Sequence, residues 1–287
     1  METFSHICIG VASVTFCAWI LGRAPARLSV PVLIVIMFSM VPLNLLHPTI
    51  PDGITAYQEP RIIFQILKGM TVAGTCAFVL AYPLLSRKSH WPATLVVALL
   101  SFNIVEALFA ELRKDITVNV ITGLLLIALI PVAARVGTVR DRDGDRVSLP
   151  LDWTWILIYA LWNFAFVLQI TGQGRWIVFN FTQILAPAIL IGFRPDRFMK
   201  ARITTLFAAT FLWQGFGVYE PLFAASDVWS ERQLMLPIRN VAFAIVLVYA
   251  FHTVRCYLRT GDVRTLIDAV LHKAWPRLNK PARSQYK

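Results

Sequence analysis

The chain has 287 residues, of which 57% are hydrophobic and 15% are charged, and its formal net charge is +11. Soluble domains carry about 25% charged residues, so this composition excludes an ordinary soluble protein and indicates one embedded in a lipid bilayer. In a multi-span protein a basic excess marks the loops that face the cytoplasm. No basic patch interleaved with aromatic residues is present in the sequence, so we expect no nucleic-acid partner.

Apolar windows of about 17–23 residues follow one another along the chain and predict an all-α membrane protein with about nine transmembrane helices. The first window does not have the charge order of a signal peptide, because Glu2 precedes it and Arg23 and Arg27 follow it. We therefore expect a retained span with its N-terminus outside. The windows are residues 5–21, 30–46, 63–85, 92–111, 116–134, 152–171, 176–194, 202–219 and 234–255.

Basic residues alternate between the loops on the two sides of these spans. Loops on the other side carry fewer basic residues and more acidic ones, so the positive-inside rule predicts an N-out, C-in topology. The predicted cytoplasmic loops contain Arg23, Arg27, Arg87, Lys88, Arg135, Arg140, Arg142, Arg146, Arg194, Arg197, Lys200 and Arg202. The predicted external loops contain Arg61, Arg113, Lys114, Arg175, Arg232 and Arg239.

The segment after the last span, "DVRTLIDAVLHKAW", has the spacing of an amphipathic helix. We expect this helix to lie on the cytoplasmic membrane surface; a partner-binding helix is the alternative. The predicted organisation is an N-terminal span and loop (1–29), a helical membrane domain (30–257) and a cytoplasmic helix with a basic tail (258–287). The apolar face of the helix consists of Val263, Leu266, Ile267, Val270, Leu271 and Trp275.

Polar residues inside the spans recur with a period of about 60 residues. This period predicts four parallel two-helix repeats after the first span, related by an axis along the membrane normal. The polar positions lie in the outer half of each helix, so the repeats would enclose a cavity with one polar layer. First helices carry Asn44, Asn103, Asn163 and Gln214, and second helices carry Lys68, Asn119, Asn180 and Asn240.

Lys68 and Glu106 are the sharpest candidates for function, because ionisable groups inside a membrane are costly and usually face a cavity. They would supply charge to a solute site, and the amides would orient the solute. Two alternatives remain open: the two residues pair with each other, and the amides join helices. Gln183, three residues after Asn180, shares its helical face, and Arg239 is either an anion contact or an interfacial anchor.

The remaining motifs predict no metal site, cofactor or known enzyme chemistry. His47 and the acidic residues of "HPTIPDGITAYQEPR" lack a metal-ligand spacing, and this segment is expected to cap the cavity. "DRDGD" (141–145) lacks the distal glutamate of a calcium loop and reads as a charged turn. "ELRKD" (111–115) and "SERQ" (230–233) are predicted to be solvated turns. The four cysteines lie in apolar runs without a C-x-x-C pair.

The segments "NIVEALFAEL" and "WILIYALWNFAFV" resemble a family of multi-span bacterial membrane proteins of unknown function. In that family an N-x-x-E-A helix precedes a W-N-F-A-aromatic helix. The likeness covers about residues 57–215, and it is strongest at 162–165, then at Asn103, Glu106 and Ala107. The resemblance implies a membrane fold and emphasises these positions, but it implies no reaction, substrate or cofactor.

These patterns lead to one expected function and one alternative from another class. We expect a multi-pass protein of a bacterial inner membrane, with its C-terminus cytoplasmic, that transports a small polar or ionic solute or forms a channel for it. The alternative is a non-transporting subunit or sensor that binds a ligand or lipid headgroup and a protein partner; a homo-oligomer is compatible with both. A membrane-embedded enzyme acting on lipid would need a nucleophile or metal that the motifs do not provide.

Overall fold

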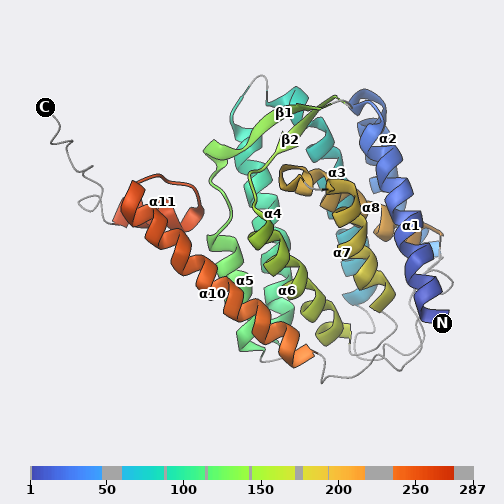
Figure 1. Cartoon of the computed structure of the whole chain (residues 1–287). Helices are drawn as coiled ribbons and strands as arrows, with labels where there is room; N and C mark the ends of the chain where they lie inside the picture. The colour runs from blue at the N-terminus through green and yellow to red at the C-terminus, as the bar shows by residue number, and fades with distance from the viewer. Residues whose placement is uncertain are drawn as a thin grey trace, which may run out of the picture. The chain divides into compact units, whose positions relative to one another are not determined.

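In the computed structural model the chain is mostly helical, with one two-stranded hairpin (Figure 1). The structure describes residues 2–46, 60–86, 89–113, 116–141, 144–171, 177–192, 194–216 and 235–274. Each predicted apolar window overlaps one helix. The elements are α1 (Glu2–Arg23), α2 (Ala26–Leu46), α3 (Pro60–Leu85), α4 (Trp91–Leu112), α5 (Thr117–Ala128), η1 (Ala133–Arg135), β1 (Gly137–Asp141), β2 (Gly144–Ser148), α6 (Trp153–Thr171), α7 (Ile177–Ile191), η3 (Pro195–Arg197), α8 (Phe198–Phe216), α10 (Met235–Thr260) and α11 (Leu266–Ala274).

Within the described residues, four helices are long and apolar enough to cross a membrane: α1, α3, α4 and α10. Shorter apolar stretches occur in α2, α5, α6 and α7. A span needs about 20 apolar residues, so these four helices indicate a membrane protein. The predicted all-α class is confirmed at this level.

The fifth predicted span ends earlier than its apolar window suggests. The window runs to residue 134, whereas α5 ends at Ala128. Pro131 explains the difference, because proline lacks an N–H group and clashes with the preceding helical turn. Instead, Pro131 forms a β-bridge with Thr265, flanked by hydrogen bonds from Val132 N to Arg264 O and from Leu266 N to Ile130 O, at 3.0 and 2.9 Å.

The chain forms two compact units that alternate along the sequence. Unit 1 consists of Met1–Ser89, Thr138–Ser148 and Gln173–Ser230, and unit 2 of His90–Gly137, Leu149–Gly172 and Glu231–Lys287. Unit 1 therefore contains α1, α2, α3, the hairpin, α7, η3 and α8, and unit 2 contains α4, α5, η1, α6, α10 and α11. The division predicted from the sequence, into a first span, a membrane domain and a tail, stays a prediction.

Helix α8 is the central element of unit 1. It packs against α1, α2, α3 and α7, and almost every residue from 201 to 210 is buried. Its threonines suit this position because their hydroxyl groups bond to carbonyls of the preceding turn; Thr205 Oγ1, for example, donates to Ala201 O at 2.8 Å. The polar side chains of α8 are thus compatible with burial on all sides.

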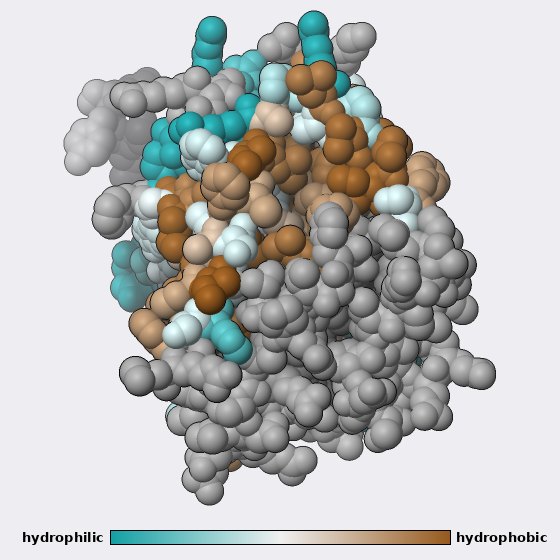
Figure 2. Space-filling model, turned by 90° about the vertical axis from the view of Figure 1, so that its right-hand side faces the viewer, coloured by the Kyte–Doolittle hydropathy of each residue, from teal (hydrophilic) through white to brown (hydrophobic). Residues whose placement is uncertain are grey.

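The α1 and α2 surfaces of unit 1 expose apolar side chains. Figure 2 shows the side on which these helices lie in Figure 1, and hydrophobic side chains gather over its coloured part. Exposed residues include Phe16 on α1 and Val35 and Phe38 on α2. Near the end of α1, the Arg23 guanidinium lies 4.3 Å from the centre of the Trp19 ring. An apolar face that ends in a tryptophan–arginine pair fits lipid contact followed by a membrane interface.

In unit 2, α5 and α6 pack in an antiparallel register set by two tryptophans. Trp155 Nε1 donates to Leu126 O at 3.1 Å, and Trp162 Nε1 donates to Asn119 O at 3.0 Å. From Trp155 to Trp162 the chain advances seven residues along α6, and their partners on α5 lie seven residues apart in the opposite order. The two helices are therefore antiparallel. Gly123 allows this approach, since a Cβ there would lie 2.4 Å from Leu108 of α4 and 3.2 Å from Trp162.

Helix α11 begins with a capping box and packs on α10 and α5. Thr265 is the N-cap residue, and Asp268 stands three positions into the helix. Asp268 Oδ2 accepts from Thr265 N at 2.9 Å and from Arg264 N at 3.0 Å, and Asp268 N donates back to Thr265 Oγ1 at 3.5 Å. These bonds satisfy N–H groups that the first turn leaves without helical partners. The predicted amphipathic helix therefore forms; the basic tail after residue 274 lies outside the described residues.

Candidate functional site

The predicted site residues are divided between the two units. Lys68, on α3, and Gln183, on α7, belong to unit 1. Unit 2 contains Asn103 and Glu106 on α4, Asn119 on α5, Asn163 on α6, and Arg239 and Asn240 on α10. The side chains of Asn44, Asn180 and Gln214 lie outside the described residues, as do His47 and the rest of the predicted external cap. A single polar layer across all eight repeat positions therefore stays a prediction.

Glu111 is the buried acid at which the polar residues of unit 2 meet, and the sequence prediction for it is wrong. We expected "ELRKD" to be a solvated turn, but α4 continues to Leu112, and Glu111 is completely buried in its last turn. Its Oε1 atom accepts a hydrogen bond from Asn119 Nδ2 at 2.5 Å. Its Oε2 atom has no hydrogen-bond partner within the described part of the chain. Unit 2 therefore holds a completely buried carboxyl group with one oxygen that lacks a hydrogen-bond partner among the described residues.

Two further side chains of unit 2 interact with this carboxyl group. The Trp162 indole lies close enough to interact with Glu111, although its N–H group forms its hydrogen bond with Asn119 O. The positive charge of Arg239, at the start of α10, also acts on Glu111, and Arg239 Nε is buried without a hydrogen-bond partner among described residues. The Glu111 cluster, meaning Glu111, Asn119, Trp162 and Arg239, therefore joins four helices at one end of unit 2.

The other predicted residues of unit 2 differ in exposure. Asn103 Nδ2 donates to Tyr159 Oη at 3.2 Å, which joins α4 to α6. Asn163 is buried, one residue after Trp162 of the Glu111 cluster, and Glu106 is half-buried. Asn240 is exposed. Asn103 thus fits the alternative in which amides join helices, whereas Asn163 lies next to the cluster.

In unit 1, the buried guanidinium group of Arg202 is paired with Gln183. Arg202 Nη1 donates to the side-chain and backbone oxygens of Gln183, at 2.5 and 3.0 Å, which joins α8 to α7. Gln183 therefore has a structural partner that the sequence did not suggest. Lys68 is half-buried, and its backbone carbonyl accepts from Thr71 Oγ1 at 3.0 Å. Lys68 and Glu106 belong to different units, and pairing between them stays a prediction.

The hairpin of unit 1 provides a second buried cation. Arg146, on β2, donates to Asp196 through Nη1 to the backbone oxygen at 3.0 Å and through Nη2 to Oδ2 at 2.5 Å. Only 3% of the Arg146 side chain is exposed. The sequence predicts a charged turn at 141–145 but not the two strands that flank it, because short polar strands lack a strong alternating pattern.

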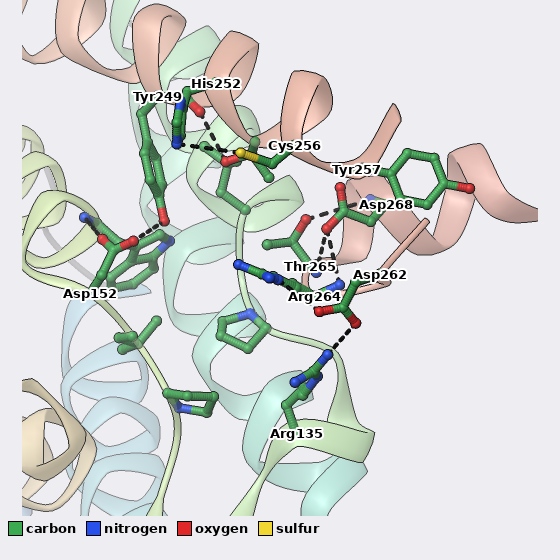
Figure 3. Close-up of a pocket in the computed structure, with 16 residues that line it drawn as sticks. Arg135, Asp152, Tyr249, His252, Cys256, Tyr257, Asp262, Arg264, Thr265 and Asp268 are labelled. Atoms are coloured by element: carbon green, nitrogen blue, oxygen red, sulfur yellow. Dashed lines mark hydrogen bonds and ion pairs between the residues drawn. The ribbon is translucent and has the colours of Figure 1, made fainter. Parts of the chain in front are cut away.

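A polar pocket of about 340 Å³ lies at the opposite end of unit 2 from the Glu111 cluster (Figure 3). Its walls come from the C-terminal half of α10, the start of α6, the segment after α5 and the segment that leads into α11. The α10–α11 pocket, as we call it, was not predicted, since its walls meet only when Pro131 bridges to Thr265. Its ionisable lining residues are Arg135, Asp152, Tyr249, His252, Cys256, Tyr257, Asp262, Arg264 and Asp268.

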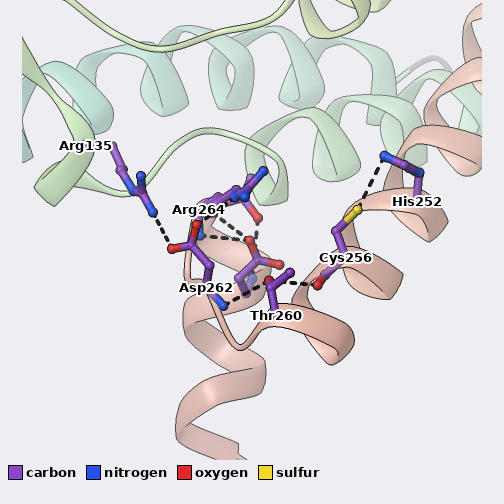
Figure 4. A network of polar contacts seen from close by, with 8 residues as sticks. Arg135, His252, Cys256, Thr260, Asp262 and Arg264 are labelled. Atoms are coloured by element: carbon purple, nitrogen blue, oxygen red, sulfur yellow. Dashed lines mark hydrogen bonds and ion pairs between the residues drawn. The ribbon is translucent and has the colours of Figure 1, made fainter. Parts of the chain in front are cut away.

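Two arginines share one carboxylate at the rim of this pocket (Figure 4). Arg135 Nη2 donates to Asp262 Oδ1, and Arg264 Nε donates to Asp262 Oδ2 at 2.9 Å. The hydrogen bond from Arg264, with a further contribution from Arg135, holds the pKa of Asp262 below its ordinary value. The same pairing raises the pKa of Arg264. Each oxygen of the Asp262 carboxylate therefore accepts a hydrogen bond from one of the two arginines.

The other two carboxylates of the pocket, Asp152 and Asp268, form no ion pair with a described residue, although the charges of Asp268 and Arg264 act on each other. Asp152 caps α6, since Oδ1 accepts from Trp155 N at 2.8 Å, and Oδ2 accepts from Tyr249 Oη at 2.5 Å. Asp268 uses Oδ2 for the cap of α11, and its buried Oδ1 has no hydrogen-bond partner in the described structure. The pocket thus contains two carboxylates whose negative charge is not balanced by an ion pair.

Within the described residues, no group of three or more His, Cys, Asp and Glu side chains could hold a metal ion. Comparisons with protein-family models, curated proteins and solved structures give no match. The geometry of the Glu111 cluster and of the α10–α11 pocket therefore carries the functional argument.

Proposed function

We propose that the protein is a membrane transporter or channel-like protein for a small polar or charged solute, with the Glu111 cluster as part of its solute site. The observation that supports this proposal is the complete burial of Glu111 with an Oε2 atom that lacks a hydrogen-bond partner among described residues. A buried ionisable group in a membrane is expensive and by default suggests function. Asn119 and Arg239 would orient and balance a solute that carries both donors and acceptors.

The proposed topology places this cluster near the external side of a bacterial inner membrane. With about nine spans and the N-terminus outside, α4 ends and α5 and α10 begin at the external face. Arg146 and Arg202 support this orientation less than the other loop arginines, because both are buried and have protein partners. The four parallel repeats, and the resemblance to the N-x-x-E-A family, remain parts of the proposal.

The test is a thermal-stability screen of the purified chain with inorganic ions and small polar metabolites. A ligand at one hundred times its dissociation constant adds about 2.7 kcal/mol to stability. We expect one solute class to stabilise the wild type and to lose this effect in Glu111→Gln, which keeps the size of the side chain. Glu106→Gln is the matched comparison, since Glu106 lies on the same helix and is half-buried.

The outcomes of this screen are distinct. Loss of the response only in Glu111→Gln supports the Glu111 cluster, and loss only in Glu106→Gln would move the site to the position predicted from the sequence. A bound solute that the protein does not carry into sealed vesicles would contradict transport. It would favour the alternative, a non-transporting subunit or sensor with a protein partner.

A further inference from the structure

The α10–α11 pocket has features of a ligand site that is separate from the proposed solute site. It lies where α5 and α10 end, whereas the Glu111 cluster lies where both helices begin. Its volume of about 340 Å³ is within the range of small-molecule pockets, roughly 300–1,000 Å³. Its residues come from four separate segments of unit 2, so only the folded bundle forms it.

The charge of the lining residues determines which ligand the pocket suits. Asp262 is neutralised by Arg135 and Arg264, whereas Asp152 and Asp268 receive only neutral hydrogen-bond donors from described residues. Of the three aspartates that line the pocket, only Asp262 forms an ion pair with a lining arginine in the described part of the chain. The missing partner is therefore a cation.

A carboxylate oxygen without a partner and an aromatic ring in the pocket also favour a cationic ligand. Asp268 is 1% exposed, and its Oδ1 atom, which has no partner among the described residues, can only be satisfied by a donor. Figure 3 shows Asp152 and Tyr249 across the pocket from Asp262 and Arg264. Tyr249 adds an aromatic surface, which attracts organic ammonium groups. The absence of a three-ligand cluster among described residues argues against a metal ion.

We propose that the α10–α11 pocket binds a small organic cation that carries one or two ammonium groups, with Asp152 and Asp268 as its counter-charges. Because Asp262, Thr265 and Asp268 belong to the segment that begins α11, the bound cation would also hold α11 against α10. This proposal does not depend on transport through the Glu111 cluster.

The experiment measures binding of 1,4-diaminobutane to the full chain in detergent at pH 7. We compare it with 1,4-butanediol, which has the same shape without charge, and with Mg²⁺, which supplies two charges without the organic frame. Asp152→Asn is the informative variant, since asparagine also caps helices well and keeps the acceptor for Tyr249. Asp145→Asn, in the hairpin of unit 1, removes the same charge outside the pocket.

We expect the diamine alone to raise the unfolding midpoint, with at least tenfold weaker binding to Asp152→Asn and unchanged binding to Asp145→Asn. Equal effects of Mg²⁺ or butanediol, or equal affinity in Asp152→Asn, would overturn the proposal. If Asp152→Asn does not fold, hydrogen exchange of the wild type decides. The diamine should slow exchange of amides in 262–274, and an unchanged rate there would overturn the proposal as well.

Discussion

Both compact units bury ionisable side chains, but the surroundings of these side chains differ. In unit 1, Arg146 is paired with Asp196, and Arg202 donates to both oxygens of Gln183. In unit 2, Glu111 and Asp268 are equally buried, and each keeps one carboxylate oxygen without a hydrogen-bond partner among described residues. Buried polar groups that form hydrogen bonds with each other are typical of a structural role. A buried acceptor without a protein partner is typical of a binding site, where a ligand can supply the donor. The comparison assigns structural roles to the two buried arginines of unit 1, although Gln183 Nε2 also lacks a partner among described residues, and ligand contacts to the Glu111 and Asp268 carboxyl groups of unit 2.

The largest expected effect tests the structural role of the Arg146–Asp196 pair. Asp196→Ala leaves the Arg146 guanidinium buried without its carboxylate, so the free energy of unfolding at neutral pH should fall by about 3 kcal/mol. Arg194→Gln removes only the exposed partner of Asp196 and should change it by less than about 0.5 kcal/mol. Chemical denaturation in detergent measures both. Equal losses in the two variants would show that burial of Arg146 does not require this pair.

The same pair should respond to acid. Burial raises the pKa of Asp196, but the hydrogen bonds and charges of Arg146 and Arg194 outweigh this effect, so the pKa is lowered overall. A lowered folded-state pKa gives stability that is complete above the ordinary pKa of aspartate and lost as the pH falls through the folded value. The stability difference between wild type and Asp196→Ala should therefore shrink in strong acid. A difference that persists there would exclude the charge as its cause.

The close approach of α4, α5 and α6 is the next test, and it concerns the packing around the Glu111 cluster. Gly123→Ala would place a methyl group against Leu108 and Trp162, and overpacking of this kind costs about 2 kcal/mol. Gly137→Ala is the matched control, because nothing lies within 4 Å of its added Cβ. Thermal unfolding of the two variants compares them. A Gly123→Ala protein as stable as the control would mean that the three helices can separate slightly.

The smallest expected effect concerns the capping box of α11. Thr265→Ala removes the hydroxyl that accepts from Asp268 N, which should weaken the helix by about 1 kcal/mol. Val270→Ala, on the exposed side of α11, should leave it unchanged. Hydrogen exchange of the amides in 266–274 reports on the helix directly. If exchange is equally fast in both variants, the contacts with α10 and α5, rather than the cap, hold α11 in place.

Helix positions could be predicted from the sequence, whereas most of the pocket and cluster contacts could not. Apolar windows locate helices because lipid requires long apolar runs. They fail at residues 129–134, where Pro131 ends α5 although the hydropathy stays high. Asn119 was selected from its repeat position, but its partner Glu111 was missed because a short charged string resembles a loop. The predicted window 92–111 already ended on this acid, so the error was to assign Glu111 to the solvated turn that follows.

The α10–α11 pocket depends on contacts between distant segments. Arg135 and Asp262 are 127 positions apart in the sequence, and all of α6 to α10 lies between them. The bridge between Pro131 and Thr265 brings their segments together. No local sequence pattern predicts a contact between segments so far apart in the chain. The capping box, by contrast, is a local pattern in which Thr265 is followed three residues later by an acid, although our sequence analysis used only the apolar spacing of this segment.

The alternation of the two units along the chain has a consequence for biosynthesis. Helix α3 ends at residue 85, and α8, on which α1, α2 and α3 all pack, begins at residue 198. A ribosome that adds about 10 residues per second needs on the order of ten seconds to make the intervening chain. During that time the first three helices lack their central partner, and the α4–α6 segment of unit 2 is synthesised. The α1–α3 segment can therefore reach its final packing only after α8 has been synthesised.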